Sequence, residues 1–265
     1  MRTDAVNERP IDSQAVESNE SKNARARATE HEVKPNYTQT RTIELDPEYL
    51  AAHRVITDLS ASPAGAAYKI LRTQILQRLR TNGWRTLGIT ATRQNHGKTL
   101  TALNLGISLA MEVNQTVLVA DLDLRHPSLA NYLSPAHLNG ISDYLLGYLD
   151  ISEIMVHPGI ARLVILPGRE SMVNSSEQLS SPRMVQLVEE LKTRYPDRIV
   201  LFDLPPLFVG DDVMAFAPNV DAILLVLEEG KTTREELRRA YELLDGQRIL
   251  GTILNKSIHN LKSTF

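Results

Sequence analysis

The chain has 265 residues, of which 42% are hydrophobic, enough for one sizeable domain with a buried core. Its 29 basic and 32 acidic residues give a formal net charge of −3, which argues against a dedicated polyanion binder, so we expect no nucleic-acid partner. The absence of cysteine excludes disulfides, thiolate nucleophiles and cysteine-ligated zinc, and fits a reducing compartment. The sequence starts without the apolar run of a signal peptide, and no stretch approaches the ~18 apolar residues of a membrane span, so we expect a cytoplasmic protein.

Residues 1–40 are rich in Ser, Asn, Glu, Arg and Lys and carry few large apolar side chains. Such a segment buries too little apolar surface to offset the entropy of ordering, so we predict a disordered N-terminal arm. Residues 41–84 are predicted to form a helical extension. Its first helix begins near Asp46, which precedes a proline as helix starts often do. A longer helix ends at Gly83 and has apolar residues at spacings of three and four, namely Tyr68, Leu71, Ile75 and Leu79.

Residues 85–257 alternate short β-type runs with helical patterns, and residues 258–265 form a short tail. The predicted strands cover residues 86–90, 116–121, 163–166, 198–203, 222–227 and 249–255. The predicted helices between them cover residues 98–112, 182–195 and 233–245. Near-continuous Val, Ile and Leu strands joined by crossover helices are typical of an α/β domain whose mostly parallel sheet is covered by helices on both faces. Ligands of such sheets bind at the carboxyl ends of the strands.

A phosphate-binding loop is indicated by the stretch TATRQNHGKTLTALNLG at residues 90–106. Gly97, Lys98 and Thr99 match the end of the pattern G-x-x-x-x-G-K-[ST]. In that pattern backbone N–H groups surround phosphate oxygens, the lysine reaches the β and γ phosphates, and the hydroxyl binds Mg²⁺. The helix predicted to begin at Lys98 would direct its unpaired N–H groups at the bound anion.

The first half of this pattern is degenerate. Thr92 occupies the position of the first glycine, and Asn95 and His96 stand where related loops often have glycine or a small acidic residue. Asn95 is tolerable because asparagine adopts the left-handed conformation more readily than other non-glycine residues. For His96 two interpretations stay open, which are contact with a phosphate and a loop histidine that faces solvent.

Two further apolar runs end in carboxylates at the same edge of the predicted sheet. VLVADLDLRHP places Asp121 and Asp123 two residues apart. Carboxylates this close repel each other unless a cation lies nearby, and Mg²⁺, Lys98 and Arg125 are available. The alternative interpretation is that both aspartates cap the following segment. RIVLFDLPP ends in Asp203, the Walker B pattern in which an aspartate completes the surroundings of Mg²⁺ opposite the P-loop hydroxyl.

With these motifs the chain resembles the bacterial tyrosine kinases of exopolysaccharide and capsule export, within the MinD/ParA-like P-loop ATPases. Within that group it is most similar to the exosortase-associated tyrosine autokinases. The resemblance covers about residues 45–257, and its most specific part is the run D-x-D-x-R-x-P, which separates this group from ordinary P-loop proteins. It is carried by the segments GKTLTALNLGISLAMEVNQTVLVADLDLRHPSL, RYPDRIVLFDLPPLFVGDD, VDAILLVLEEGKTTREEL and ILGTILNKS.

The resemblance implies a protein-tyrosine kinase or ATPase that uses ATP and Mg²⁺. In that group the loop lysine and hydroxyl bind Mg·ATP, the paired aspartates assist the metal and activate the attacking tyrosine, and the asparagine that ends the last strand lies by the adenine. The implied catalytic residues are Lys98, Asp121, Asp123 and Asp203. The implied metal ligands are Thr99, Asp121, Asp123 and Asp203. The implied nucleotide-binding residues are Asn95, His96, Gly97, Lys98, Thr99, Leu100 and Asn255.

The resemblance also implies a membrane polysaccharide co-polymerase (chain-length regulator) as partner, a homo-oligomer, and a position at the inner face of the membrane. The helical E-x-x-R-x-x-R motif through which the group forms rings would fall on Ala66, Lys69 and Arg72, and because it lacks its acid we expect weaker self-assembly. No tyrosine lies beyond Tyr241, so the tyrosine-rich tail of the group has no counterpart here. We therefore expect the phosphate acceptor on another protein or elsewhere in the chain, with Tyr37 the simplest choice.

Two other functions stay open on the sequence. One is a non-catalytic relative whose degenerate loop binds nucleotide weakly and which works by docking a membrane partner. The other is a MinD/ParA-type positioning ATPase, in which Arg93 would stand at the position of a lysine that acts across the dimer. The D-x-D-x-R-x-P run and the lack of a membrane-targeting tail helix favour the kinase over this second alternative.

Overall fold

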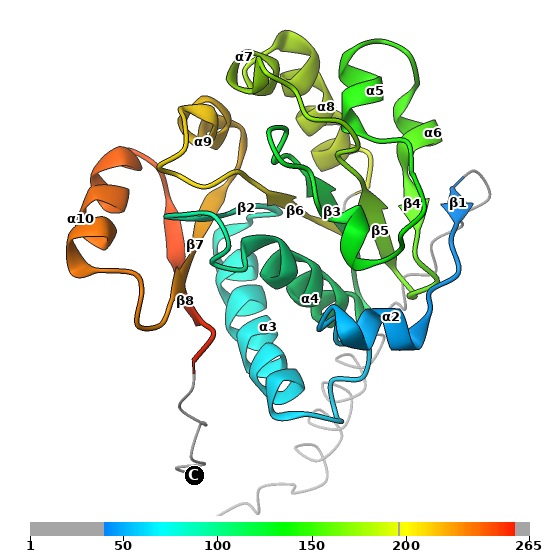
Figure 1. Cartoon of the computed structure of the whole chain (residues 1–265), viewed down its shortest axis with the longest axis horizontal. Coiled ribbons are helices and arrows are strands. Elements are labelled where there is room, and N and C mark those ends of the chain that lie inside the picture. Colours follow the sequence, from blue (N-terminus) through cyan, green and yellow to red (C-terminus); the bar gives the residue numbers. More distant parts are fainter. Residues whose placement is uncertain (1–39, 196, 258–265) are drawn as a thin grey trace, which may run out of the picture. The chain divides into compact units, whose positions relative to one another are not determined.

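The computed structural model describes residues 40–195 and 197–257 (Figure 1). All of the predicted arm except residue 40, together with Tyr37 and the tail at 258–265, lies outside the described residues. Within the described part of the chain, no helix combines the length and the apolar character needed to cross a bilayer.

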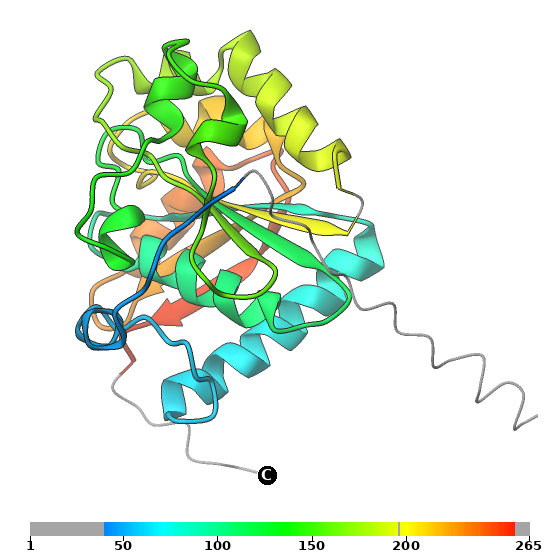
Figure 2. The same cartoon turned by 90° about the vertical axis from the view of Figure 1, so that its right-hand side faces the viewer.

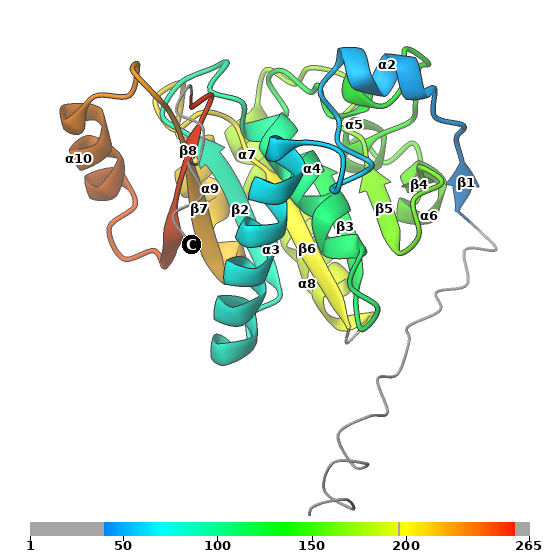
Figure 3. The same ribbon diagram turned by 90° about the horizontal axis from the view of Figure 1, so that it is seen from below.

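The described residues form an eight-stranded sheet with the order β1-β4-β5-β3-β6-β2-β7-β8 (Figures 1 and 3). Neighbouring strands run parallel, except that β4 and β5 are antiparallel. The strands are β1 (Arg41–Thr42), β2 (Thr86–Ala91), β3 (Thr116–Asp121), β4 (Val156–His157), β5 (Leu163–Leu166), β6 (Arg198–Asp203), β7 (Ala222–Glu228) and β8 (Ile249–Asn255). All six predicted strands are present, and β2 and β7 end one residue later than predicted. The predicted α/β fold with a mostly parallel sheet is confirmed.

Helices cover both faces of this sheet (Figures 1 and 2). On one face, Ile75 of α3 and Leu103 of α4 belong to one buried apolar cluster. On the other face, Leu187 of α8 and Phe216 of α9 belong to a second cluster. The helices are α2 (Pro47–Ala52), α3 (Pro63–Asn82), α4 (Lys98–Ala110), α5 (Ile141–Leu145), α6 (Ile151–Ile154), α7 (Ser175–Leu179), α8 (Pro182–Thr193), α9 (Asp212–Phe216) and α10 (Arg234–Leu243), with 3₁₀ turns η1 (Ala130–Tyr132) and η2 (Ala217–Asn219).

Local capping chemistry sets the ends of α3 and α10. The Ser62 hydroxyl accepts a hydrogen bond from the Gly65 N–H at 3.1 Å, and Gly83 ends α3 in the left-handed conformation with φ +66°. At α10, Thr233 and Glu236 form a capping box, in which each side chain accepts a hydrogen bond from the other residue's backbone N–H. These caps fix where α3 leaves the sheet and where α10 begins after β7.

The register of the central strands brings the acidic strand ends together. Strand β6 lies between β3 and β2, so that Asp203 pairs in register with Asp121 on one side and with Ile89 on the other. All three strands run in the same direction, and the loop at residues 92–97 leaves the sheet just after β2. The loop and both carboxylates therefore share the carboxyl edge of the sheet, where ligands of parallel sheets bind.

Candidate nucleotide-binding site

The loop at residues 92–97 connects β2, which is buried along its whole length, to α4. Gly97 is the N-cap of α4 with φ +87°, and a Cβ at this position would lie 2.1 Å from the amide nitrogen of Asn255. Glycine is the residue that satisfies both the backbone angle and this close approach. The first N–H groups of the 13-residue helix α4 have no helical partners, and such a helix start attracts an anion.

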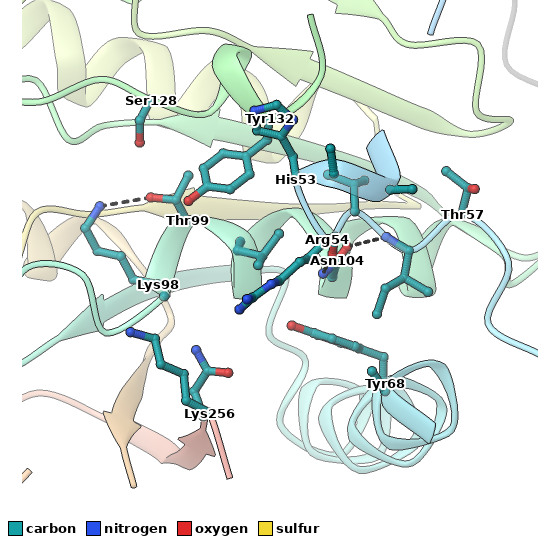
Figure 4. A pocket seen from close by; sticks show the side chains of 18 of the residues that line it. His53, Arg54, Thr57, Tyr68, Lys98, Thr99, Asn104, Ser128, Tyr132 and Lys256 are labelled. Atoms are coloured by element: carbon teal, nitrogen blue, oxygen red, sulfur yellow. Dashed lines mark hydrogen bonds between the residues drawn. The ribbon is translucent and has the colours of Figure 1, made fainter. Parts of the chain in front are cut away.

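Lys98 lies at the centre of a buried group of charges beside this helix start. Its Nζ is 2.8 Å from Asp123 Oδ2, and its distances to Asp203 Oδ1 and Thr99 Oγ1 are 3.4 Å and 3.2 Å. Burial lowers the pKa of Lys98, but attraction by Asp203 and Asp123 outweighs burial, so the net effect is a raised pKa. Figure 4 shows the ammonium group turned toward Thr99. The structure thus brings together four residues that the sequence assigned to one site.

Asp121 and Asp203 face each other at the ends of neighbouring strands, with exposed fractions of 1% and 0%. Burial, together with repulsion by Asp203, raises the pKa of Asp121 to about 7. Burial also raises the pKa of Asp203, against the opposing pull of Lys98. Because three carboxylates share the ammonium group of Lys98 at this strand edge, Asp121 and Asp203 ionise less readily than a free aspartate.

The two aspartates of the D-x-D run also hold the backbone that follows them. Asp121 Oδ2 accepts hydrogen bonds from the N–H groups of Ser128 and Leu129, both at 2.8 Å. Asp123 Oδ1 accepts a hydrogen bond from the His126 N–H at 3.1 Å, while Asp123 Oδ2 contacts Lys98. The capping interpretation and the charge interpretation are therefore both realised, with Asp121 mainly a backbone acceptor and Asp123 divided between the two roles.

The sequence suggested Lys98 and Arg125 as cations for the Asp121–Asp123 pair. The structure places Lys98 beside the pair and Arg125 elsewhere. Arg125 Nε lies 2.9 Å from Oδ2 of the buried Asp212, whose other oxygen accepts from the Ser175 hydroxyl. Arg125 therefore connects the loop after β3 to α7 and α9 rather than neutralising the D-x-D carboxylates.

The two least expected side chains of the loop contact each other. Thr92 Oγ1 lies 3.3 Å from His96 Nδ1, and both residues are buried. The interpretation of His96 as a solvent-facing histidine is wrong, since it is 4% exposed and burial lowers its pKa. Its Nε2 lies 4.0 Å from Glu228 Oε2. Asn95 has φ +63°, the left-handed conformation that makes asparagine tolerable at this position.

A cavity of about 1280 Å³ opens in front of the loop (Figure 4). Three of the expected site residues, His96, Asp121 and Asp203, are not among the residues that line it. The expected residues that do line it are Asn95, Gly97, Lys98, Thr99, Leu100, Asp123 and Asn255. Its opposite wall is formed by residues 51–58, which follow α2 and which the sequence did not connect with the site.

Asn104 of α4 attaches this wall to the helix that carries the loop. Its Oδ1 accepts from the Ile56 N–H at 2.9 Å, and its Nδ2 donates to the Arg54 carbonyl at 3.1 Å. Arg54 has φ +60°, and its side chain lies in the cavity (Figure 4). A polar residue on the buried face of a predicted helix needs hydrogen-bond partners, so Asn104 was the available signal that another segment packs there.

Two tyrosines that no motif marks also line the cavity. Tyr132 of η1 extends toward Thr99, and Tyr68 of α3 faces the same space (Figure 4). Burial raises the pKa of both phenols, and the charge of Asp203 adds to the effect at Tyr132. Both hydroxyls therefore stay protonated near neutral pH and can donate hydrogen bonds into the cavity.

The site fits a magnesium nucleotide better than a metal ion held by the protein alone. Among the described residues, no group of three acidic or histidine side chains is arranged to hold a metal ion. Mg²⁺ in nucleotide sites typically takes one or two protein ligands, several waters and phosphate oxygens. Asp123 and the Thr99 hydroxyl offer such hard oxygen ligands in the cavity lining, while Lys98 and the helix start offer positive charge to phosphates.

A parallel sheet with a glycine-capped loop at a helix start and carboxylates at the adjacent strand ends defines a P-loop nucleotide-binding protein. No family model matches the chain. The tyrosine-protein kinase CpsD of Streptococcus agalactiae is 28% identical over 173 residues, which cover 64% of this chain and 74% of CpsD. The succinoglycan biosynthesis transport protein ExoP of Rhizobium meliloti is 30% identical over 212 residues, which cover 78% of this chain and 27% of ExoP.

Solved structures agree with these relatives. The kinase domain of the Escherichia coli tyrosine kinase ETK matches with a TM-score of 0.69 at 28% identity, over 82% of this chain and 83% of that domain. The septum site-determining protein MinD of Pyrococcus horikoshii, complexed with Mg-ADP, shares the fold with a TM-score of 0.54 at 24% identity, over 64% of this chain and 69% of MinD. The chain is therefore homologous to the kinase domains of bacterial protein-tyrosine kinases and has the MinD-like P-loop fold.

Proposed function

We propose that this chain is a protein-tyrosine kinase of a capsule or exopolysaccharide system, which transfers the γ-phosphoryl group of Mg·ATP to a tyrosine hydroxyl. The observation that carries the proposal is the buried ammonium group of Lys98, held by Asp123 and Asp203 beside the N-terminus of α4. Phosphoryl transfer requires mainly positioned charge around the transferred group, and this arrangement supplies it. Similarity to CpsD and to the ETK kinase domain supports tyrosine as the acceptor.

ATP bound with Mg²⁺ supplies the phosphoryl group and ADP as the leaving group. In our assignment Lys98 gives the phosphates a fixed positive charge, and Asp203 keeps that charge in place from behind the cavity wall. Thr99 and Asp123 offer oxygen ligands to the metal. Asp121 acts through the backbone, because its hydrogen bonds hold the segment that begins at Asp123.

The acceptor phenol must lose its proton as its oxygen forms the bond to phosphorus and the bond from phosphorus to ADP breaks. We assign Asp123 as the base that takes this proton, because among Asp121, Asp123 and Asp203 it is the one that lines the cavity. General-base assistance of this kind requires a carboxylate within reach of the acceptor hydroxyl.

The relatives support a proposal for the partner and the location. This chain aligns with 27% of ExoP, which is named a transport protein, but with 74% of CpsD. A kinase domain thus occurs both as part of a much longer transport protein and as a chain of similar size to this one. We propose that this chain works in the cytoplasm, as a homo-oligomer, at the inner face of the membrane through a polysaccharide co-polymerase. The finer assignment to the exosortase-associated tyrosine autokinases rests on the sequence segments quoted above.

The test is Mg·ATP binding by calorimetry together with a phosphotyrosine blot, with the chain alone and with a co-expressed co-polymerase. We expect binding by the wild type, phosphotyrosine in at least one of the two preparations, and loss of phosphotyrosine in Lys98→Met. Lys231→Met is the matched control, since Lys231 is an exposed lysine of the same molecule whose ion pair lies with Glu228.

The two alternatives give different results. Binding without phosphotyrosine in either preparation would indicate a non-catalytic nucleotide-binding module. An unchanged phosphotyrosine signal in Lys98→Met would show that this site does not take part in the reaction. A positioning ATPase would instead form ATP-dependent dimers that are lost in Arg93→Ala, although here Arg93 pairs with Glu236 of its own chain.

A further inference from the structure

The end of β8 holds the phosphate-binding loop through side-chain contacts to its backbone. The Asn255 side-chain amide donates to the His96 carbonyl at 2.8 Å. Lys256 Nζ donates to the Asn95 carbonyl at 2.6 Å and lies 2.9 Å from Glu228 Oε2 at the end of β7. We call these three residues, Glu228, Asn255 and Lys256, the β8 clamp. The side chains of Asn255 and Lys256 contact a loop about 160 positions earlier in the chain, and Glu228 holds Lys256.

The two residues joined by the lysine hydrogen bond both have an uncommon backbone conformation. Lys256 has φ +56° and Asn95 has φ +63°. A lysine in the left-handed region is unfavourable, and such residues persist where the surroundings hold them and often lie at functional sites. Lys256 is also partly exposed, whereas its partner Glu228 is buried. The contact is therefore built into the fold rather than the chance pairing of two long surface side chains.

The clamp fixes the direction of two peptide groups. In a planar trans peptide, the carbonyl of one residue and the N–H of the next point in opposite directions. Tying the Asn95 carbonyl to Lys256 therefore turns the His96 N–H away from the clamp, and tying the His96 carbonyl to Asn255 does the same for the Gly97 N–H. Among the described residues, neither of these N–H groups donates to another group. Free loop N–H groups of this kind bind phosphate oxygens in P-loops.

We propose that the β8 clamp sets the orientation of the His96 and Gly97 N–H groups and thereby the affinity of the degenerate loop for the phosphates of Mg·ATP. Lys256 is a positioning residue in this role. The inference rests on the proposed function, since it presupposes that the loop binds a nucleotide. Contacts from β7 and β8 thus hold the loop in a conformation that the consensus pattern reaches through additional glycines.

A simpler role for Lys256 would be direct contact with the bound anion, because Lys256 lines the cavity (Figure 4), as does Asn255. Glu228 separates the two roles. If Lys256 acts as a positioning residue, Glu228→Ala frees its ammonium group, loosens the loop and weakens nucleotide binding. If Lys256 contacts the nucleotide directly, removing a nearby negative charge leaves binding unchanged or tightens it.

The experiment measures Mg·ATP dissociation constants and steady-state kinetics for four variants of the full chain. For Lys256→Met we expect the dissociation constant and KM to rise about tenfold, with kcat changed by less than about threefold, as expected for loss of a charge-assisted hydrogen bond that acts on binding. Lys256→Arg keeps a donor and should restore most of the affinity. Lys231→Met removes an ion pair to the same Glu228 without touching the loop, and should bind like the wild type.

Equal affinities of Lys256→Met and Lys231→Met, or unchanged or tighter binding by Glu228→Ala, would overturn the inference while leaving the proposed function intact. Absence of Mg·ATP binding in the wild type would overturn the proposed function instead. In that case the NMR chemical shift of the Asn95 carbonyl carbon still tests the clamp without nucleotide. This shift should change in Lys256→Met and stay as in the wild type in Lys231→Met, and equal shifts in the two variants would exclude the clamp.

Discussion

Gly97→Ala tests whether the loop and the end of β8 are coupled. Gly97 has φ +87°, and the added Cβ would lie 2.1 Å from Asn255 Nδ2. No such contact is tolerated, so the Asn255 amide must move and give up its 2.8 Å hydrogen bond to the His96 carbonyl. The substitution therefore combines a backbone penalty with the loss of one contact that holds the loop.

The two terms have known magnitudes. An alanine in the left-handed conformation costs roughly 1–2 kcal/mol, and losing a typical intramolecular hydrogen bond costs about 1 kcal/mol. The free energy of unfolding of Gly97→Ala should then fall by about 2–3 kcal/mol. For a domain of this size this corresponds to a decrease in Tm of about 4–12 °C.

Gly83→Ala is the matched control, because Gly83 also has positive φ (+66°) but its added Cβ would meet no atom within 4 Å among the described residues other than its own chain neighbours. Urea and thermal denaturation should show a loss of about 1–2 kcal/mol for the control, from the backbone term alone. Calorimetry should show weaker Mg·ATP binding for Gly97→Ala and unchanged binding for Gly83→Ala. If both variants lose the same stability and bind Mg·ATP equally, the coupling of Gly97 to Asn255 is refuted.

Three further outcomes are expected. Asn104→Ala leaves the Ile56 N–H and the Arg54 carbonyl without partners, so urea denaturation should show a decrease of about 2 kcal/mol in the free energy of unfolding. Amide exchange at residues 54–58 should also accelerate. Unchanged exchange there would contradict the attachment of this segment to α4. Burial raises the pKa of Asp221, but hydrogen bonds from the N–H groups of Arg85 and Thr86 outweigh burial and hold the pKa below 3.8. The charged carboxylate therefore stabilises the fold above pH 3.8. This stabilisation is lost as the pH falls through the pKa that Asp221 has in the folded protein. The stability difference between the wild type and Asp221→Asn should thus be about 1–2 kcal/mol and constant above pH 5 and should shrink toward pH 2, whereas a difference independent of pH would contradict the assignment. Chelation of Mg²⁺ should abolish phosphoryl transfer reversibly, and transfer that persists in excess chelator would argue against a metal-bound nucleotide.

The sequence predicted the parts of the fold that repeat over several residues. The six long strands are continuous apolar runs, and their order along the chain, with helices between them, defines a parallel sheet. Strands β1 and β4 have two residues each, too few to produce any periodic pattern. Helices α5, α6, α7 and α9 have four or five residues and were missed for the same reason. Their positions depend on packing against the sheet rather than on local sequence.

The site divides in a similar way. Lys98, Thr99, Asp123 and Asp203 could be expected to converge because each follows or ends a strand at the same sheet edge. The contacts that hold these four residues in place could not be predicted, because tertiary packing decides which residues pair. The contact between His96 and Thr92 within the loop and the attachment of residues 54–56 by Asn104 are examples. Neither pairing has a spacing or motif that a sequence alone would single out.

The degenerate loop is best understood by asking what each glycine of the pattern does. A glycine is required where φ is positive or where another group approaches too closely for a Cβ. Gly97 meets both conditions and is retained, and Asn95 takes the other positive φ as the non-glycine residue that tolerates it best. Thr92 has no positive φ, and its side chain occupies space beside His96. The pattern is therefore broken where the fold accommodates a side chain and kept where it does not, which is why a loop with one consensus glycine can still present its N–H groups to a phosphate.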